Sequence, residues 1–486
     1  MKIFKIAFIL ICLMAGSAFQ FLSAQKKSDS FLFKKDSTFK IMQFTDIHWE
    51  SGKPENATVI SMMESVLDKE QPDLVVFTGD IVTSGDPKKG WRDVSAPVIE
   101  RKIRWIATLG NHESEGNTAR NEIYRILKSI PLNVNSATAD NIFGFGNFYL
   151  PISSNKNKQA AILYFFDSNE YVPSHIPGSY DWIRLDQIKW YKELSQSIKE
   201  KNDGQPIPAL AFFHIPLPEY KVVKDMEETV GHKSEGVSSP VLNSGLFAAM
   251  VEQKDVIGVF TGHDHNNDFI GTLYDIALAY GRCSGHSGYG DLRIGSRVIE
   301  LHQDQFHFKT WIATPGKSSN NFVYPTDVKL DFEKDDLLPA QAIAKALQPG
   351  LNYKYFEGEI ESVNEIQNLK VKKTGVANTI SHRFGEQDDH FALQFTGYLD
   401  IPEDGFYEFY LCSDDGAILK IDDQVIIDND GGHSAQLKRN DIGLEKGMHS
   451  IEILYFEDYE GNVLEVGISG LSFREGPLPS GLLYHD

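Results

Sequence analysis

The stretch "DVIGVFTGHDH", residues 255–265, decides how this chain folds. Its apolar run predicts a strand buried in a sheet, and the glycine after the run ends that strand. His263 and His265 follow directly, two residues apart. Polar side chains of this kind gather at the carboxyl ends of the strands in an α/β sheet. The stretch therefore indicates a site at a sheet edge, to which other strands contribute similar residues.

Four further apolar runs end in the same way, in "IMQFTDIH" (41–48), "LVVFTGD" (74–80), "WIATLGNHE" (105–113) and "ALAFFHIP" (209–216). Taken singly, such an ending is more often a surface or core feature. Their joint order and placement predict one shared site. The candidate residues are Asp46, His48, Asp80, Asn111, His112, His214, His263 and His265.

The residue types at these strand ends point to metal chemistry. Carboxylate, imidazole and amide oxygen without thiolate suit divalent ions such as Mn, Fe or Zn. Asp46 and His48, two apart on a segment expected to be extended, point the same way and can hold one ion together. Two ions bridged by a carboxylate, about 3.5–4 Å apart, hold the attacking and leaving oxygens of phosphoryl transfer and supply hydroxide at neutral pH. The sequence therefore predicts a two-metal centre.

Strand and helix patterns alternate from about residue 38 to residue 315. The strand-like runs are "FKIMQF", "DLVVF", "IRWIATL", "AILYFF", "PALAFF" and "VIGVF", and helical patterns such as "TVISMMESVLDKE" lie between several of them. In that helix, the residues expected on one apolar face are Val59, Met62, Met63, Val66 and Leu67. Strands buried on both faces and separated by helices predict an α/β core.

The composition and the periodicity of the sequence change after residue 315. Residues 316–345 are polar, contain prolines and show no period, so we assign them to a linker; the alternative is an extended last edge of the first domain. From 346 to 475 the strands alternate in β fashion and Asp/Gly turns separate them, which predicts an all-β sandwich. The first domain is then residues 33–315. A long polar linker favours a second domain that tethers the first rather than covering its site.

The charge balance bears on partners. The chain has 47 Lys and Arg against 68 Asp and Glu, a formal charge of -21. Such a surface repels polyanions, so we expect no nucleic acid partner, although a local metal pocket can still hold a phosphate.

The first residues have the pattern of a secretory signal. Lys2 and Lys5 precede an apolar core, and small residues at Ser23 and Ala24 favour cleavage after Ala24. The alternative is a retained membrane anchor, but the apolar run is short for a span and no later stretch is long enough to cross a membrane. Because Cys12 leaves with residues 1–24, only two cysteines remain and a disulfide scaffold is excluded. We expect export to a periplasm or to the cell surface and the extracellular space.

The order "DIH…GD…GNHE…H…GHDH" resembles that of the calcineurin-like metallophosphoesterases. The stretches "LGNHESE", "FFHIPLPEY", "LNSGLFAAMVEQ" and "GVFTGHDHNNDF" are similar to its purple-acid-phosphatase-like branch, and the resemblance runs from about 38 to 301. It implies an α/β (α+β) double-sheet sandwich with two metal ions. It also implies in-line attack on a phosphoester by a metal-bound hydroxide.

The resemblance assigns a role to each candidate residue. Asp46, His48 and His265 would bind the first metal, Asn111, His214 and His263 the second, and Asp80 would bridge the two. His112 would contact the phosphoryl oxygen and protonate the leaving group. One departure stands out, because Thr83 occupies the place where true purple acid phosphatases carry a tyrosine ligand. We therefore expect no tyrosinate–iron colour, and the metal stays open among Mn, Fe and Zn.

The second domain resembles the PA-fourteen domain, a β-sandwich first described in anthrax protective antigen. The resemblance rests on "YKYFEG", on "FTGYLDIPEDGFYEFYLCSDDGAILKIDDQVIIDNDG" and on "KGMHSIEILYFE". Some members of that family bind sugars through a calcium ion held by adjacent aspartates, which implies Asp414 and Asp415 here, with Asp428 or Asp430 assisting. Oxygen-rich loops suit calcium. The alternative is that "SDDG" is only a tight turn.

Two further histidine-containing stretches lie outside the motifs. In "AYGRCSGHSGYG" (279–290), Arg282, His286 and Tyr289 are candidates for substrate contact, although a structural turn is the favoured interpretation. His302 and His307 alternate along a strand and are expected to be edge residues.

The leading functional hypothesis is an exported two-metal phosphomonoesterase acting on a small phosphoester, with an accessory domain that is a candidate for carbohydrate binding. One alternative is a phosphodiesterase acting on a small diester or lipid. Another is a glycan-binding surface protein with a degenerate phosphoesterase domain, which would hold less than one tight transition-metal ion. The fold alone does not name the substrate.

Overall fold

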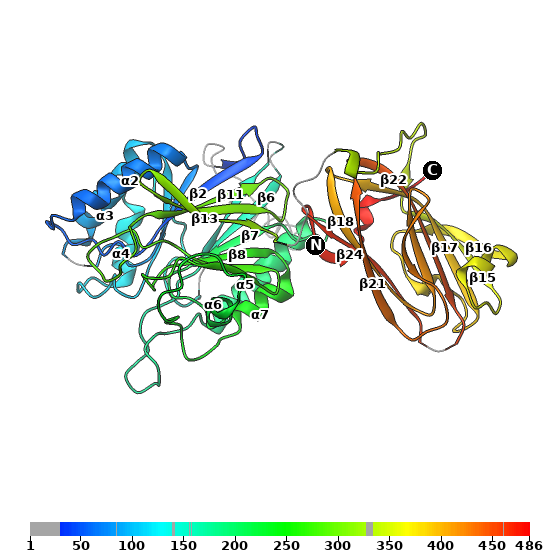
Figure 1. The fold of residues 1–486 in the computed structure, drawn as a ribbon. Helices are drawn as coiled ribbons and strands as arrows, with labels where there is room; N and C mark the ends of the chain where they lie inside the picture. The colour runs from blue at the N-terminus through cyan, green and yellow to red at the C-terminus, as the bar shows by residue number, and fades with distance from the viewer. Residues whose placement is uncertain are drawn as a thin grey trace, which may run out of the picture.

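The computed structural model of the protein divides into an α/β body and a β body (Figure 1). It describes residues 30–83, 85–138, 141–154, 156, 158–326, 334–459 and 461–486. The predicted signal peptide, residues 1–24, lies outside the described residues. Within the described ranges, none of the helices combines the length and the apolar character that crossing a membrane requires.

Two sheets form the centre of the α/β body. The seven-stranded sheet has the order β1-β5-β6-β7-β8-β10-β9 and the six-stranded sheet β13-β12-β11-β2-β3-β4. The strands of the first are β1 (Phe31–Leu32), β5 (Phe148–Ser153), β6 (Gln159–Phe165), β7 (Ala209–Phe212), β8 (Val256–Thr261), β9 (Ile270–Leu273) and β10 (Ile276–Tyr280). Those of the second are β2 (Thr38–Phe44), β3 (Leu74–Thr78), β4 (Arg104–Thr108), β11 (Ser296–His302), β12 (Phe308–Thr314) and β13 (Lys317–Tyr324). Strands β2, β3 and β4 are parallel, as are β6, β7 and β8, so their carboxyl ends point one way within each sheet.

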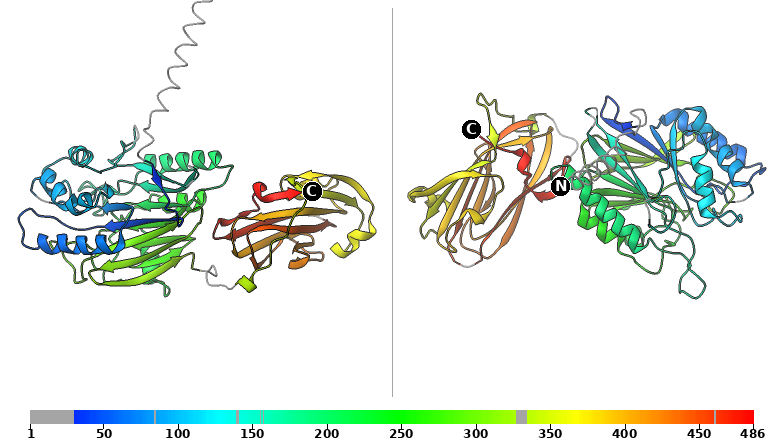
Figure 2. Two further views of the ribbon diagram at one scale, coloured as in Figure 1. Left: turned by 90° about the horizontal axis from the view of Figure 1, so that it is seen from above. Right: turned by 180° about the vertical axis from the view of Figure 1, so that it is seen from behind.

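Helices cover the outer face of each sheet, and an apolar core fills the space between the sheets (Figure 2). The helices on the six-stranded sheet are α2 (Asn56–Glu70), α3 (Pro87–Glu100) and α4 (Arg120–Lys128), and those on the other sheet are α5 (Leu185–Lys201), α6 (Tyr220–Asp225) and α7 (Leu246–Gln253). The predicted apolar face of α2 is buried at all five positions. The predicted double-sheet α/β class is confirmed.

Helix α3 was not predicted from the sequence. Gly90 and Pro97 interrupt its pattern, and both residues lower helix propensity. The helix forms because Asp86 caps its first turn, accepting a hydrogen bond from the backbone N–H of Lys88 at 2.9 Å, and because Trp91 is buried against the sheet. Tertiary packing therefore overrides the local signal here.

The β body is a sandwich of an eight-stranded and a four-stranded sheet with one shared core. The strands of the larger sheet are β14 (Gln348–Pro349), β15 (Leu351–Glu357), β16 (Val371–Ala377), β17 (Phe391–Ile401), β19 (Ala417–Ile421), β20 (Gln424–Asn429), β22 (Gly447–Glu457) and β25 (Leu483–His485). The smaller sheet holds β18 (Gly405–Asp414), β21 (Gln436–Leu444), β23 (Val463–Gly470) and β24 (Phe473–Pro477). Because β25 pairs with β14 and β17, this domain extends past the predicted limit at residue 475.

The predicted linker is shorter than expected at both ends. Strand β13 pairs with β12 along its length, so the first third of residues 316–345 belongs to the first domain, as the alternative interpretation had it. At the other end, Leu338 bridges to Leu444 of the sandwich. The sequence did not reveal this strand, because Phe322 and Tyr324 are its only buried residues and the polar residues before them have no apolar period.

The sandwich contacts the α/β body at the amino ends of its strands. The backbone N–H of Phe306, in the turn between β11 and β12, donates to Leu471 O at 2.5 Å, and Lys254 Nζ, just before β8, donates to Glu475 O at 2.9 Å. The turn is at the start of β2, because His302 pairs with Thr38. The second domain therefore sits at the end of the sheets opposite to the carboxyl ends where the candidate ligands lie.

Candidate metal centre

The candidate ligands follow the carboxyl ends of five strands from both sheets. Strands β2, β3 and β4 of the six-stranded sheet deliver three loops, and β7 and β8 of the seven-stranded sheet deliver two. The residues that these loops carry are Asp46, His48, Asp80, Asn111, His112, His214, His263 and His265. All except His48 and His112 are buried. The structure therefore brings the five loops that carry the candidate residues to one place.

The backbone of these loops differs from the expected geometry. Asp46 and His48 lie at φ of 53° and 47°, in the left-handed region, so the segment between them is not extended as predicted. Their side chains converge because the loop follows its neighbour: the N–H of Asp46 donates to Gly79 O at 3.1 Å, and that of His48 donates to Asp80 O at 2.9 Å. Left-handed backbone costs free energy outside glycine, and such strain concentrates at functional sites.

The glycine that ends β8 permits a close approach. A Cβ atom at Gly262 would lie 1.9 Å from Thr45 Oγ1 and 2.6 Å from the Asp46 carboxylate. The backbone N–H of His263 instead donates to the Asp46 carboxylate oxygens at 3.1 and 3.0 Å. Gly262 therefore lets the loops after β2 and β8 meet, and this contact joins the two sheets at the site.

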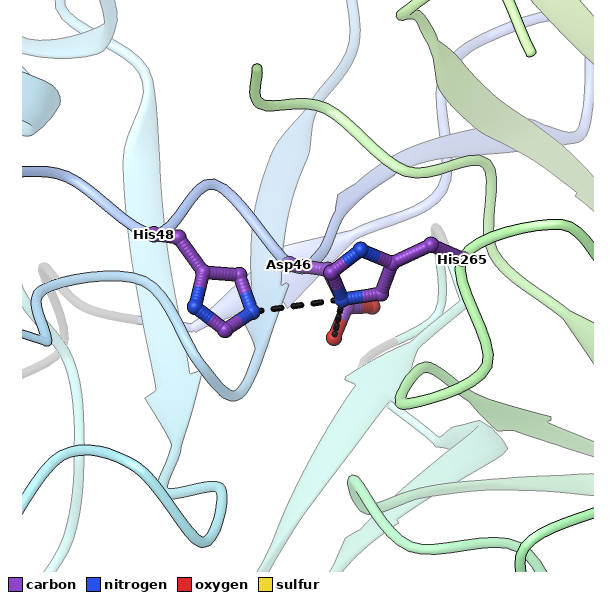
Figure 3. Close-up of side chains that lie close together, drawn as sticks. All are labelled: Asp46, His48 and His265. Atoms are coloured by element: carbon purple, nitrogen blue, oxygen red, sulfur yellow. Dashed lines mark hydrogen bonds and ion pairs between the residues drawn. The ribbon is translucent and has the colours of Figure 1, made fainter. Parts of the chain in front are cut away.

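The first ligand group consists of Asp46, His48 and His265 (Figure 3). The Nε2 atoms of His48 and His265 are 3.2 Å apart, and Asp46 Oδ1 is 3.5 Å from His265 Nε2. The ligand atoms of the three side chains all lie within 4.8 Å of one another. This is the set expected to hold the first ion.

The second ligand group consists of Asp80, His214 and His263. His214 Nε2 is 2.9 Å from Asp80 Oδ2 and 3.3 Å from His263 Nδ1. The same Asp80 oxygen is 3.9 Å from the Nε2 atom of His48, which belongs to the first group. Asp80 therefore lies between the two groups, where a bridging carboxylate is required.

The chemistry of the donor atoms fits a pair of metal ions. In each group two imidazole nitrogens face each other, at 3.2 Å in the first and 3.3 Å in the second, where two neutral imidazoles can share at most one proton. Asn111 Oδ1 is buried and has no partner among the described residues. Unpaired buried acceptors cost free energy, and a cation shared between these atoms would satisfy them.

Backbone carbonyls outside the groups orient two of the histidines. His214 Nδ1 donates to Thr78 O at 2.7 Å, and His265 Nδ1 donates to Tyr289 O at 2.7 Å. Each bond fixes the tautomer that leaves the Nε2 lone pair free for an ion. The ring of Tyr289 also stacks on that of His265, with centroids 4.2 Å apart and planes within 8°.

For two of the candidate ligands, His263 and Asp46, the surroundings favour the protonation state that metal binding needs. Burial, followed by the charge of His214, lowers the pKa of His263 to about 3, so this imidazole is neutral at pH 7. Although burial opposes it, the hydrogen bond from His265 and the charge of His214 lower the pKa of Asp46 to about 2. A neutral imidazole and an ionised carboxylate are the forms that bind metal ions.

His112 lies at the mouth of the centre. Its Nε2 atom is 4.0 Å from Asp80 Oδ2, its ring is 5.2 Å from that of His48, and its Nδ1 atom is 2.7 Å from Glu115 Oε2. The side chain is about one-third exposed (34%), so a molecule from solvent can reach it. This is the position that a general acid beside the ions requires.

Glu113 supports the site but was given no role from the sequence. It is buried and accepts hydrogen bonds from the backbone N–H groups of Asp80, Ile81 and Gly110, at 3.0, 2.7 and 2.8 Å. Burial, followed by the charge of Asp80, raises the pKa of Glu113 to about 7. Its place in "GNHE" was the available signal. It ties the loop after β4 to the loop after β3.

Of the three candidates in the glycine-rich loop 279–290, Tyr289 is the one that contacts a candidate ligand directly, through its ring stacked on His265. Arg282 is buried against Asp268 and donates to Arg293 O at 3.0 Å, so it is a structural residue. His286 lines a small hollow beside His265.

A second cluster of acids lies in the β-sandwich. Asp414, Asp415 and Glu457 place carboxylate oxygens within 4.8 Å of one another. Glu457 Oε2 accepts from Tyr455 OH at 2.8 Å, whereas its Oε1 atom is buried and has no partner among the described residues. Burial, followed by the charges of Asp415 and Asp414, raises the pKa of Glu457 to about 7. An all-oxygen group of this kind suits calcium.

The sequence missed Glu457 and placed the assisting aspartates wrongly. Asp430 binds Ser362 Oγ at 2.5 Å and the N–H of Val363 at 2.8 Å, at the start of a short 3₁₀ helix. Asp428 is exposed and accepts from the N–H of Asp430 at 3.1 Å. Both aspartates therefore bind groups outside the cluster. Closeness to Asp415 in the sequence does not bring a side chain to it, because strand packing decides which residues lie together.

The fold and the site are those of the metallophosphoesterase family. The family model "Calcineurin-like phosphoesterase" matches residues 39–267, and the "PA14 domain" model, the family called PA-fourteen above, matches residues 347–469. The chain belongs to the calcineurin-like phosphoesterases, with purple-acid-phosphatase-like relatives, and carries a PA14 domain after the phosphoesterase domain. Both resemblances inferred from the sequence are thus confirmed.

Individual relatives place the chain more closely. It is 35% identical over 292 residues to the "Probable inactive purple acid phosphatase 29" of Arabidopsis thaliana, covering 53% of this chain and 75% of that protein. It is 32% identical over 327 residues to "Phosphatase DCR2" of Saccharomyces cerevisiae, covering 59% of this chain and 55% of that protein. A solved dimetal phosphatase from Danio rerio covers 59% of this chain and 98% of its own length, at 13% identity and a TM-score of 0.42.

Proposed function

We propose that the protein is an exported two-metal phosphomonoesterase that hydrolyses a small phosphoester. The observation that carries this proposal is the completeness of the centre. Both ligand groups are present, Asp80 lies between them, and His112 stands at the mouth. Chains with a degenerate centre would lack some of these donors.

The chain's own residues would divide the work of hydrolysis. When bound, two ions would supply Lewis-acid stabilisation and an activated water. Asp80 holds the two ligand groups at a fixed separation, and Glu113 fixes the loops that carry Asp80 and His112. His112 Nε2 faces the centre and would give its proton to the leaving oxygen as the ester bond breaks.

Activity has to be tested directly, because the names of the relatives differ. One is called a probable inactive purple acid phosphatase and another a phosphatase. Thr83 stands where true purple acid phosphatases carry a tyrosine ligand, while the remaining carboxylate and histidine candidates form the two ligand groups. We therefore propose Mn, Fe or Zn ions and no tyrosinate colour.

The deciding experiment is hydrolysis of para-nitrophenyl phosphate and of its bis-ester by residues 25–486, with Mn, Fe or Zn added. Metal-dependent turnover of the monoester supports the proposal. A preference for the bis-ester would replace it with a phosphodiesterase acting on a small diester or lipid. A folded chain that holds less than one transition-metal ion would favour a glycan-binding protein with a degenerate centre.

The acidic cluster of the sandwich supports a second function. We propose that Asp414, Asp415 and Glu457 hold a calcium ion through which the PA14 domain binds carbohydrate. The cluster supports this because its three carboxylates converge and one buried Glu457 oxygen lacks a partner among the described residues. Calorimetry with calcium, followed by a glycan array with and without calcium, tests it. If the domain did not bind calcium, the alternative interpretation of "SDDG" as a tight turn would hold.

Export is proposed from the first residues of the sequence alone. Expression in a bacterium, fractionation and N-terminal sequencing test it. A mature chain that begins at Gln25 outside the cytoplasm is expected, and a chain that keeps residues 1–24 would contradict the proposal.

A further inference from the structure

A hairpin between β6 and α5 lies against the second ligand group. Tyr171 and Tyr180 pair across it in antiparallel fashion, the N–H of Val172 donates to Ser179 O at 3.1 Å, and the two tyrosine rings stack with centroids 5.8 Å apart. The edge of one ring meets His263: the centroids of Tyr180 and His263 are 4.4 Å apart at 90°. The hairpin thus touches a ligand of the second ion.

The other tyrosine of the hairpin starts a chain of hydrogen bonds. Asn111 Nδ2 donates to Tyr171 OH at 2.8 Å, and Tyr171 OH donates to Glu115 Oε1 at 3.2 Å. The other oxygen of that carboxylate, Oε2, accepts from His112 Nδ1 at 2.7 Å. Asn111, Tyr171, Glu115 and His112 therefore form one continuous chain, with a metal-ligand candidate at one end and the candidate general acid at the other.

Each bond in this chain decides what its end residue presents to the centre. Because Tyr171 takes the amide nitrogen of Asn111, the amide oxygen is the atom left for the second ion, and that oxygen has no other partner among the described residues. Because Glu115 takes Nδ1–H of His112, the Nε2 atom faces Asp80 and the centre. Without these bonds the amide of Asn111 could flip to present its nitrogen, and the ring of His112 could turn its Nε2 atom away from the centre.

We propose that Glu115 and Tyr171 are positioning residues for phosphoester hydrolysis, Glu115 for the proton donor His112 and Tyr171 for the ligand atom of Asn111. The proposal rests on the proposed function. In the step concerned, a water that has lost one proton to solvent attacks as hydroxide, and its oxygen forms a bond to phosphorus as the bond from phosphorus to the leaving oxygen breaks. The leaving oxygen takes the Nε2 proton of the His112 imidazolium, which leaves a neutral imidazole whose Nδ1–H stays bonded to Glu115.

A test of Glu115 uses the leaving group as a probe. A poor leaving group depends on protonation more than a good one does. Glu115→Gln should lower kcat about 3-fold on para-nitrophenyl phosphate and about 30-fold on an alkyl phosphate, with KM changed less than about 2-fold. His112→Ala should show the same trend, and adding Glu115→Gln to it should cost nothing further.

The matched control is Glu122→Gln. Its carboxylate is 50% exposed, against 49% for Glu115, and forms one ion pair, with Arg125 at 2.6 Å. It should leave kcat unchanged on both esters. An equal loss on both esters in Glu115→Gln, or none, would overturn the role of Glu115.

A test of Tyr171 uses metal content and needs no activity. Tyr171→Phe keeps the ring and removes the acceptor of Asn111. It should lower the affinity of the second ion about 10-fold or more, so that the chain holds nearer one ion than two after dialysis, whereas Glu115→Gln holds two. If Tyr171→Phe retained two ions as tightly as the wild type, the proposed role of Tyr171 would be wrong. A wild type inactive on every ester overturns the proposed function and the role of Glu115 with it, while metal content still decides Tyr171.

Discussion

The metal centre of the α/β body and the acidic cluster of the sandwich are built in different ways. The centre in the α/β body takes eight side chains from five loops, between Asp46 and His265, and mixes imidazole, carboxylate and amide. The cluster in the sandwich takes two adjacent aspartates, at the end of β18 and in the turn to β19, and one glutamate from β22, which pairs with β19, and all its donors are oxygens. The first needs the whole sheet arrangement, and the second needs one strand pairing.

The difference predicts different metals and different behaviour. Buried imidazoles suit transition metals, which bind tightly, whereas a small group of carboxylates suits calcium, which exchanges readily. A chelator selective for calcium should therefore empty the sandwich and leave the phosphoesterase centre loaded. Four experiments examine this contrast, beginning with the largest expected effect.

Replacing Asp80, the candidate bridge, should abolish metal binding and hydrolysis in the α/β body and leave the sandwich unaffected. Asp80→Ala removes the carboxylate assigned as the bridge between the two ligand groups, so we expect at least about a 10³-fold loss of kcat and loss of bound transition metal. Calcium binding by the sandwich should not change. Metal analysis and ester hydrolysis measure the first effect, and calorimetry the second. Retained activity would contradict the bridging role.

Replacing the proton donor should cost activity without costing metal. His112→Ala removes the imidazole at the mouth but no ligand, so kcat should fall about 10²–10⁴-fold while two ions stay bound. Steady-state kinetics beside metal analysis check this. Loss of an ion in this variant would show that His112 supports the ligands instead.

Calcium binding by the sandwich should depend on pH, because the pKa of Glu457 is raised to about 7 by burial first and then by Asp415 and Asp414. Below pH 7 the carboxyl is protonated and competes poorly for calcium, so affinity should rise about 10-fold between pH 6 and pH 8. Glu457→Gln should bind calcium weakly and without this dependence. Calorimetry at the three pH values 6, 7 and 8 tests it, and a flat profile in the wild type would refute it.

Acid should destabilise the edge of the α/β body that meets the sandwich. Burial, followed by the charge of His302, lowers the pKa of His307 to about 4, below the 6.5 of an unfolded histidine. The unfolded state therefore binds more protons between those values, and stability is lost as pH falls from 6.5 toward 4. The loss reaches at most about 3 kcal/mol. His307→Gln should flatten this slope in urea unfolding; an unchanged slope would exclude His307 as its source.

The pKa of Glu457 is shifted in the opposite direction from that of His307. Its folded pKa lies above the 4.5 of the unfolded group, so the folded state without calcium binds more protons and loses stability as pH rises from 4.5 to 7. Falling pH thus lowers the stability of the folded state through His307 and raises it, in the absence of calcium, through Glu457. Following each domain's unfolding with its own probe would sharpen the comparison.

Much of the metal centre could be predicted because its residues share one local signature. Asp46, Asp80, Asn111, His214 and His263 each follow an apolar run, and parallel strands bring their carboxyl ends to one edge. Strand β13 and helix α3 could not be predicted, since one lacks an apolar period and the other contains Gly90 and Pro97.

By itself, the sequence determined the α/β order, the two domains and the ligands at the strand ends, because these follow from patterns a few residues long. Only the tertiary structure decided which side chains meet across loops: Glu457 beside Asp415, Tyr171 beside Asn111, and the sandwich at the amino ends of the sheets. Such contacts join residues far apart in the chain. They depend on strand register and packing, which no local pattern encodes.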